Sequence, residues 1–173
     1  MSEPFEAMLT GGHPNSLGRT VEVVDQVLAN PARFEELFAC YTSPDEVVRL
    51  RVSSAMKRIE PERRDLIMTY MDRFIEEIGA LDQASAQWTI AQLFQRTRQE
   101  LSPDQKSRAL AIMKRNLAEH EDWIVLNISM DVLAEWAADD AQLREWMVPH
   151  VQRHAKDKRK SVAARATKLL ARL

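Results

Sequence analysis

The sequence predicts an all-α protein built from repeated helical hairpins: a right-handed α–α superhelix of about four hairpins with an N-terminal helical cap. A helix-spaced group of apolar residues recurs at Val48, Ala86, Val125 and Val162, at intervals of 38, 39 and 37 residues. The 173 residues contain only four Gly and seven Pro, and strand-forming residues do not alternate with polar ones. A repeat of this length made only of helices is typical of an α-solenoid.

Each recurring group places its apolar side chains on one helix face, because they follow one another mostly at three- and four-residue steps. The groups are Val48/Val52/Ala55/Met56/Ile59, Ala86/Ile90/Leu93/Phe94, Val125/Val132/Leu133/Trp136 and Val162/Ala166/Leu169/Leu170/Leu173. The preceding helices carry complementary apolar stripes. A lone hairpin could not offset its loss of conformational entropy, so we expect each hairpin to pack against the next.

Capping signals divide the chain into ten expected helices. Ser43 and Ser102 each open a Ser-Pro-Asp sequence followed by Glu or Gln, which predicts a capping box. The expected helices are 3–9, 17–29, 31–41, 44–59, 61–79, 82–98, 103–118, 121–138, 140–155 and 157–172. We therefore expect residues 1–173 to form a single repeat domain, with 1–30 as cap and 31–173 as four hairpins.

Charge and hydropathy exclude several classes of partner. The net charge is −2, which gives no overall attraction to nucleic acid. Residues 143–173 nevertheless carry a net +7, a basic end that can contact an anion or simply form a solvated last helix. No signal peptide and no membrane-spanning stretch is evident, so we expect a cytoplasmic protein that is a monomer or a weak homodimer.

Catalytic and metal-binding motifs are not recognisable in the sequence. Cys40 is the one cysteine and lies among apolar neighbours, which favours a small core residue over a reactive thiol. His150 and His154 could share a helix face and form half of a metal site, but no third ligand is apparent. The sequence therefore predicts no enzyme, no metal and no cofactor.

Several segments resemble HEAT repeats, the armadillo-like α-solenoids. Residues 43–59, SPDEVVRLRVSSAMKRI, resemble the second helix of a HEAT repeat, with an acid near the turn followed by Val-Arg and apolar residues. Residues 157–173 are similar, although Ala163 replaces the Arg, and 120–137 and 81–94 match more loosely. The resemblance covers about residues 31–173 and extends to small bacterial HEAT-like proteins. It implies a fold and not a reaction.

In a HEAT array the second helices usually line the concave face. Positions opposite their core stripe combine large apolar side chains with amides and an acid, which suits an extended peptide or a partner helix. The candidate groove consists of Leu50, Trp88, Gln92, Trp123, Asn127, Met130 and Asp131, and the basic end of Arg153, Lys156, Lys158, Arg159, Lys160 and Lys168. Alternatively, Trp88 and Trp123 pack between adjacent repeats.

The leading hypothesis is a non-enzymatic adaptor or scaffold that binds a protein or peptide. The alternative is a nucleic-acid-binding protein related to the HEAT-like DNA glycosylases for alkylated bases, with Asp131, Trp88, Trp123 and Asn127 near the lesion. We do not expect nucleic acid, because residues outside the basic end are net acidic. A lyase or chaperone for a protein-bound chromophore is a third possibility that no residue selects.

Overall fold

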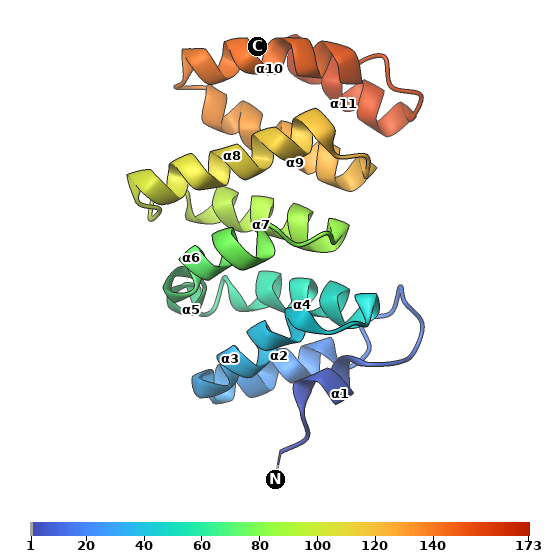
Figure 1. The fold of residues 1–173 in the computed structure, drawn as a ribbon, viewed down its shortest axis with the longest axis vertical. Helices are drawn as coiled ribbons and strands as arrows, with labels where there is room; N and C mark the ends of the chain where they lie inside the picture. The colour runs from blue at the N-terminus through green and yellow to red at the C-terminus, as the bar shows by residue number, and fades with distance from the viewer. Residues whose placement is uncertain (1) are drawn as a thin grey trace. The chain divides into compact units, whose positions relative to one another are not determined.

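The structure, a computed structural model, describes residues 2–173, and all the regular secondary structure in that range is helical. The predicted all-α class is confirmed. The elements are α1 Phe5–Leu9, α2 Thr20–Ala29, η1 Pro31–Arg33, α3 Phe34–Ala39, η2 Cys40–Thr42, α4 Glu46–Ile59, α5 Arg64–Thr69, α6 Met71–Arg73, η3 Phe74–Ile78, α7 Ala84–Thr97, α8 Pro103–Glu119, α9 Trp123–Ala137, α10 Ala141–His154 and α11 Lys160–Leu170 (Figure 1).

The chain divides into two compact units, of which the first ends at Leu93 and the second is Phe94–Leu173. The boundary falls within α7. Whether the units act as one repeat domain stays a prediction. No helix among residues 2–173 is long and apolar enough to cross a bilayer, and the cytoplasmic location also stays a prediction.

Most helix ends lie within a few residues of the expected ones, and side-chain caps fix the starts of α4, α8, α9 and α10. The capping box at Ser102 is present, with Ser102 and Gln105 each accepting a backbone N–H of the other. At α4 the expected box at Ser43 is wrong: Asp45 is the cap residue, and its carboxylate accepts from the N–H of Val47 at 2.8 Å.

The expected helix over 61–79 is the least regular one. It is broken at Tyr70 between α5 and α6, and it ends in a π-helical turn, η3, closed by the Gly79 N–H donating to the Phe74 carbonyl at 2.9 Å. Tyr70 is held by tertiary contacts: its ring packs on Phe34 at 4.6 Å, and its hydroxyl donates to Glu35 at 2.7 Å. These long-range contacts fall at the residue where the helix breaks.

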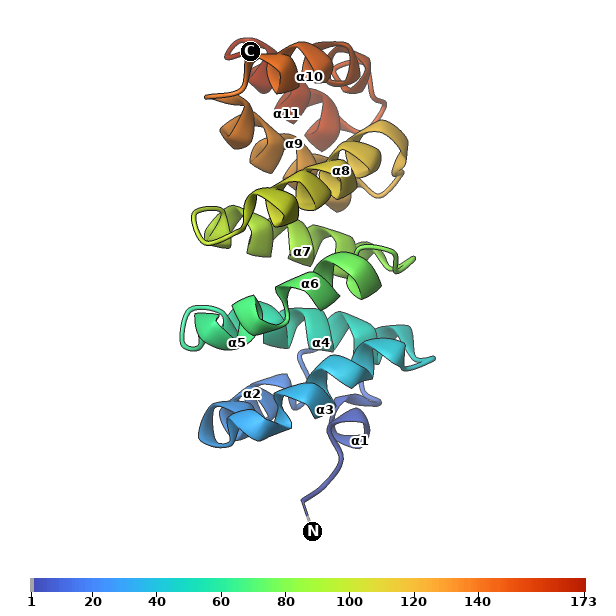
Figure 2. The ribbon, with the colours of Figure 1, turned by 60° about the vertical axis from the view of Figure 1, so that its left-hand side comes forward.

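The predicted core stripes are buried except at the C-terminal end of the last one, where Leu170 and Leu173 are half-buried. Val52, Ile90 and Val132 are at most 1% exposed, and Leu169 is 5% exposed. In the first unit Phe38 of α3 packs edge-on against Phe74, with 5.0 Å between ring centroids, which joins α3 to η3. In the second unit α8 pairs with α9 and α10 with α11, and α9 contacts both α10 and α11 (Figure 2).

The N-terminal helices α1 and α2 pack against α4. Glu36 of α3 ties α1 down, because its carboxylate accepts from the Phe5 N–H at 2.8 Å and pairs with Arg33 at 2.8 Å. The hydrogen bonds from the Arg33 guanidinium, and next the one from Phe5, lower the pKa of Glu36 against the opposing effect of burial.

Cys40 is a buried core residue, as predicted, and its Sγ lies 3.3 Å from the Glu36 carbonyl. Burial, followed by the nearby acids Glu6 and Glu36, raises the pKa of this thiol to about 11. At about pH 8 such a thiol is roughly 0.1% thiolate, whereas a free cysteine is roughly a quarter thiolate.

We therefore expect the native protein to react with a disulfide reagent such as DTNB at least about a hundred-fold more slowly than the protein in concentrated guanidinium chloride. Because Cys40 is the sole cysteine, the reaction of the unfolded chain is an internal control. Equal rates in the two states would contradict the burial of Cys40.

Candidate functional site

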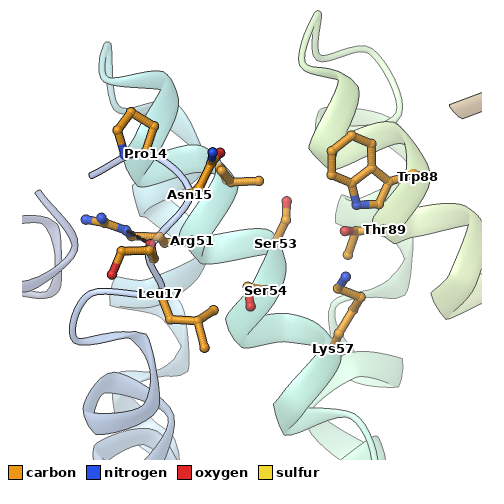
Figure 3. A pocket seen from close by; sticks show the side chains of 11 residues that line it. Pro14, Asn15, Leu17, Arg51, Ser53, Ser54, Lys57, Trp88 and Thr89 are labelled. Carbon is orange, nitrogen blue, oxygen red and sulfur yellow. Dashed lines mark hydrogen bonds between the residues drawn. The ribbon is translucent and has the colours of Figure 1, made fainter. Parts of the chain in front are cut away.

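The first unit contains a cavity of about 330 Å³ between the α1–α2 connection, α4 and the first half of α7 (Figure 3). We call it the loop pocket. It is lined by Pro14, Asn15, Ser16, Leu17, Leu50, Arg51, Ser53, Ser54, Lys57, Trp88 and Thr89. Two predicted groove residues, Leu50 of α4 and Trp88 of α7, are therefore brought together in one cavity.

One wall of the loop pocket is positioned by Arg51, whose side chain is 2% exposed. Its Nη1 donates to the carbonyls of Leu9 and Gly11, each at 2.6 Å. Its Nε donates to the Ser16 carbonyl at 3.1 Å, and its Nη2 to the His13 carbonyl at 3.2 Å. We call these four bonds the Arg51 network. They hold the exposed connection 10–19 beside α4 (Figure 1).

The connection can approach Arg51 because glycines stand where the backbone turns. Gly11 and Gly18 have φ of 79° and 52°, in the left-handed region that side chains disfavour. A Cβ on Gly18 would lie 3.0 Å from Cζ of Arg51, whereas a Cβ on Gly11 would meet nothing within 4 Å. Glycine at position 18 therefore permits both the left-handed backbone and the close approach of the Arg51 guanidinium. Glycine at position 11 permits the left-handed backbone alone.

The loop pocket has an apolar and a polar side. Leu17, Leu50 and Trp88 supply the apolar surface, and Leu17 is 41% exposed. Ser54, Lys57 and Thr89 supply polar groups, while Ser53 is engaged by the Tyr41 hydroxyl at 3.1 Å. The lining contains two cationic side chains, Arg51 and Lys57, and no carboxylate.

Thr89 is fully buried, and its hydroxyl has no hydrogen-bond partner within the described residues. Such an atom is uncommon in folded proteins and needs a reason. Four other buried polar atoms share this state in residues 2–173: Gln92 Oε1, Asn127 Oδ1, Ser129 Oγ and Trp136 Nε1. Of the five residues, Thr89 is the one that lines the loop pocket.

The other predicted groove residues have different environments. Gln92 is half-buried and outside the loop pocket lining. In the second unit Trp123 is 49% exposed, whereas Met130 is fully buried and Asn127 is buried. The half-buried Asp131 pairs with Arg165 of α11; burial nevertheless raises its pKa, against the lowering effect of Arg165. Met130 thus contributes to the core of its unit.

Part of the predicted basic end makes local contacts. Arg153 donates to the Ala118 carbonyl at 2.8 Å and so caps the C-terminus of α8. Arg159 pairs with Asp157 at 2.8 Å, and the hydrogen bonds from Arg159 lower the pKa of that acid strongly. The remaining members are exposed lysines: Lys156, Lys158, Lys160 and Lys168.

A second cavity, of about 340 Å³, lies in the second unit beside Arg98, Lys106 and Trp136. Arg98 pairs with Asp139 at 2.8 Å, and the lining residue Asp140 caps α10. His150 stacks on Trp146, and His154 Nε2 lies 2.9 Å from the Leu117 carbonyl. No group of three potential metal ligands gathers among residues 2–173.

Sequence reasoning missed Thr89, Arg51 and the loop residues 14–17. Arg51 offered a signal, since it lies beside Val52 on the core side of α4, where a charged side chain must find acceptors. The acceptors are backbone carbonyls, which have no sequence signature.

Comparisons of the chain with protein-family models, with curated proteins and with solved structures find no match. The HEAT resemblance therefore rests on the repeat pattern of this chain.

We expect Gly18→Ala to lower the free energy of unfolding by about 2 kcal/mol or more, because it adds backbone strain and a contact with Arg51. Gly11→Ala is the matched control and should cost only about 1 kcal/mol, since strain acts there alone. Denaturant unfolding of both variants measures the difference. Equal losses would mean that the close approach to Arg51 carries no energetic weight.

Proposed function

We propose that this chain is a non-enzymatic interaction module, and that the loop pocket of its first unit binds a peptide segment of a protein partner. The observation that carries the proposal is the cavity itself. It joins Leu50 and Trp88, two residues expected on a binding face, with a loop wall held by the Arg51 network. A preformed cavity with an aromatic side chain suits the anchor residue of a peptide.

The size of the loop pocket supports a small part of a peptide as occupant. A cavity of about 330 Å³ is at the lower end of the range for ligand pockets, and it has room for one or two side chains. The apolar side formed by Leu17, Leu50 and Trp88 would cover an aliphatic or aromatic anchor. Burial of such an anchor typically supplies about 1.5–3 kcal/mol.

The lining also supports binding over catalysis. Its ionisable side chains are Arg51 and Lys57, and it contains no histidine, cysteine or carboxylate. Proton transfer near neutral pH is usually carried out by such groups. The proposed role of the loop pocket is therefore recognition.

We further propose a HEAT-like arrangement, a right-handed superhelix in which hairpins follow one another in a row. It is supported by the 37–39-residue recurrence of the core stripes and, inside the second unit, by the contact between the second helices α9 and α11. In such an array the second helices would offer a shared binding face.

Small-angle X-ray scattering tests the proposed superhelix. A compact globule of 173 residues has a radius of gyration of about 16 Å. A row of hairpins is elongated, so we expect a clearly larger value for the monomer. A radius near that of the globule would contradict the superhelix and leave the loop pocket unaffected.

Peptide binding can be tested without a known partner. Random peptides displayed on phage are selected on the wild-type protein, and the enriched sequences are then measured against purified variants. We expect Trp88→Ala to weaken binding by at least about ten-fold, because loss of an aromatic anchor typically costs about 2 kcal/mol.

Trp123→Ala is the matched control, since Trp123 is half exposed and lies in the other unit. It should leave the affinities of the same peptides unchanged. Thermal unfolding must show that both variants remain folded. Failure to enrich any peptide, or equal binding by wild type and Trp88→Ala, would refute the proposed function.

A further inference from the structure

The second unit carries a cationic surface on its last helix, α11. Residues 158–173 contain six Lys or Arg and no acid. The apolar stripe of α11 is buried within the unit, so the charged side chains lie on the outer sides of the helix. Arg165, Lys168 and Arg172 follow one another at steps of three and four residues and therefore share one side of α11.

This side of α11 lies beside α9. Arg165 of α11 pairs with Asp131 of α9. Arg159 precedes α11 and donates to the carbonyl of Glu121, which precedes α9. Because these two contacts join corresponding positions of the two helices, α9 and α11 lie side by side and run in the same direction.

The adjoining side of α9 carries an exposed aromatic side chain. Trp123, Asn127 and Asp131 follow at four-residue steps and so share one side of that helix. Trp123 is 49% exposed, more than any other large apolar side chain among residues 2–173. An exposed indole beside a row of cations is a surface that can take both an apolar and an anionic group. We call the following residues the α9–α11 face: Trp123, Asp131, Arg165, Lys168 and Arg172.

Two positive charges of the α9–α11 face have no ion-pair partner. Among residues 2–173, Arg165 is the member of the cationic row that pairs with an acid. The side chains of Lys168 and Arg172 are exposed and form no hydrogen bond or ion pair within that range. Burial raises the pKa of Asp131, and these two cations act against that effect, so they lie near its carboxylate. Both charges stand at a surface that a ligand can reach.

The composition of the face favours a protein segment over a nucleic acid. A DNA duplex carries about one negative charge per 1.7 Å of its axis and is bound by extended basic surfaces. Here the cationic row is one helix wide, because the neighbouring side of α9 carries the acids Asp131 and Glu135. A peptide can follow α11 alone, placing carboxylates beside the cations and an apolar residue on Trp123.

We propose that the α9–α11 face binds an acidic segment of a protein partner, with its carboxylates held by Lys168 and Arg172 and an apolar residue packed on Trp123. The α11 helix has 11 residues and is about 16 Å long, which an extended segment of about five residues spans. The α9–α11 face lies in the other unit from the loop pocket. The inference therefore goes beyond the proposed function and can fail or succeed without it.

Two synthetic octapeptides test the inference. Both have a central Phe; in one the remaining positions alternate between Ser and Glu, and in the other Gln replaces each Glu. Binding is followed by the indole and backbone amide signals of the ¹⁵N-labelled full chain. We expect the acidic peptide to bind about ten-fold more tightly, with the largest shifts at the Trp123 indole and the α11 amides, and its advantage to shrink as salt is added.

Variants then locate the contact. Lys168→Gln/Arg172→Gln should remove most of the preference for the acidic peptide. Lys106→Gln/Lys114→Gln, on α8 of the same unit, makes the same change of net charge and should preserve the preference. Trp123→Ala should weaken binding of the acidic peptide by about three-fold. All five side chains are at least partly exposed, so we expect folded variants, which thermal unfolding checks.

Three results would overturn the inference. The first is equal binding of the acidic and the amide peptide. The second is an equal loss of preference in the α8 and α11 double variants, because net charge alone would then explain the attraction. The third is tighter binding, by about ten-fold, of a single-stranded oligo(dT) of eight nucleotides, which would assign the face to nucleic acid.

The same variants distinguish this face from the loop pocket. Peptides held in the loop pocket should respond to Trp88→Ala and not to Trp123→Ala, whereas the acidic peptide should show the reverse. Failure of the acidic peptide would leave the proposed function intact. Failure of phage selection to yield a peptide sensitive to Trp88→Ala would refute the proposed function and leave the α9–α11 face intact.

Discussion

The bonds from Arg51 to the carbonyls of Leu9, Gly11, His13 and Ser16 are the contact on which the first unit depends. A connection of about ten exposed residues would otherwise move freely, because it has few apolar contacts of its own. The guanidinium replaces those contacts with charge-assisted hydrogen bonds to the main chain. Without them, the wall formed by residues 14–17 would have no fixed position, and the loop pocket would not exist as a cavity.

The apolar and the polar residues of α4 and α7 have different roles around the loop pocket. The apolar stripes of α4 and α7 fix the two helices and so set the separation of Leu50 and Trp88. Arg51 and Thr89, polar residues of the same helices, are also buried and line the cavity. The buried hydroxyl of Thr89 has no hydrogen-bond partner among the described residues, so its burial does not stabilise the fold.

The sequence was sufficient to predict those features of the fold that depend on residues close to one another in the chain. Burial of Val52 and Ile90 follows from helical periodicity, and the caps at Ser102 and Asp140 follow from short-range side-chain bonds. The break at Tyr70 and the Arg51 network were not predictable in this way. The Arg51 bonds span 35 to 42 residues, and their acceptors are carbonyl groups that every residue possesses. Leu50 and Trp88 could be placed on a face from periodicity, but the loop that closes over them could not.

The choice of carbonyl acceptors also determines how the first unit responds to acid. Glu36 tethers Phe5 through a carboxylate whose pKa is lowered in the folded protein by Arg33, so that tether contributes stability above the ordinary glutamate pKa and loses it as the pH falls. Main-chain oxygens do not become protonated in that range. Acidification would therefore weaken the hydrogen bond between Glu36 of α3 and Phe5 of α1. The Arg51 network would still hold the connection that follows α1. The N-terminal segment of the first unit is thus held by a carboxylate contact that acid can release and by the Arg51 network, which contains no carboxylate.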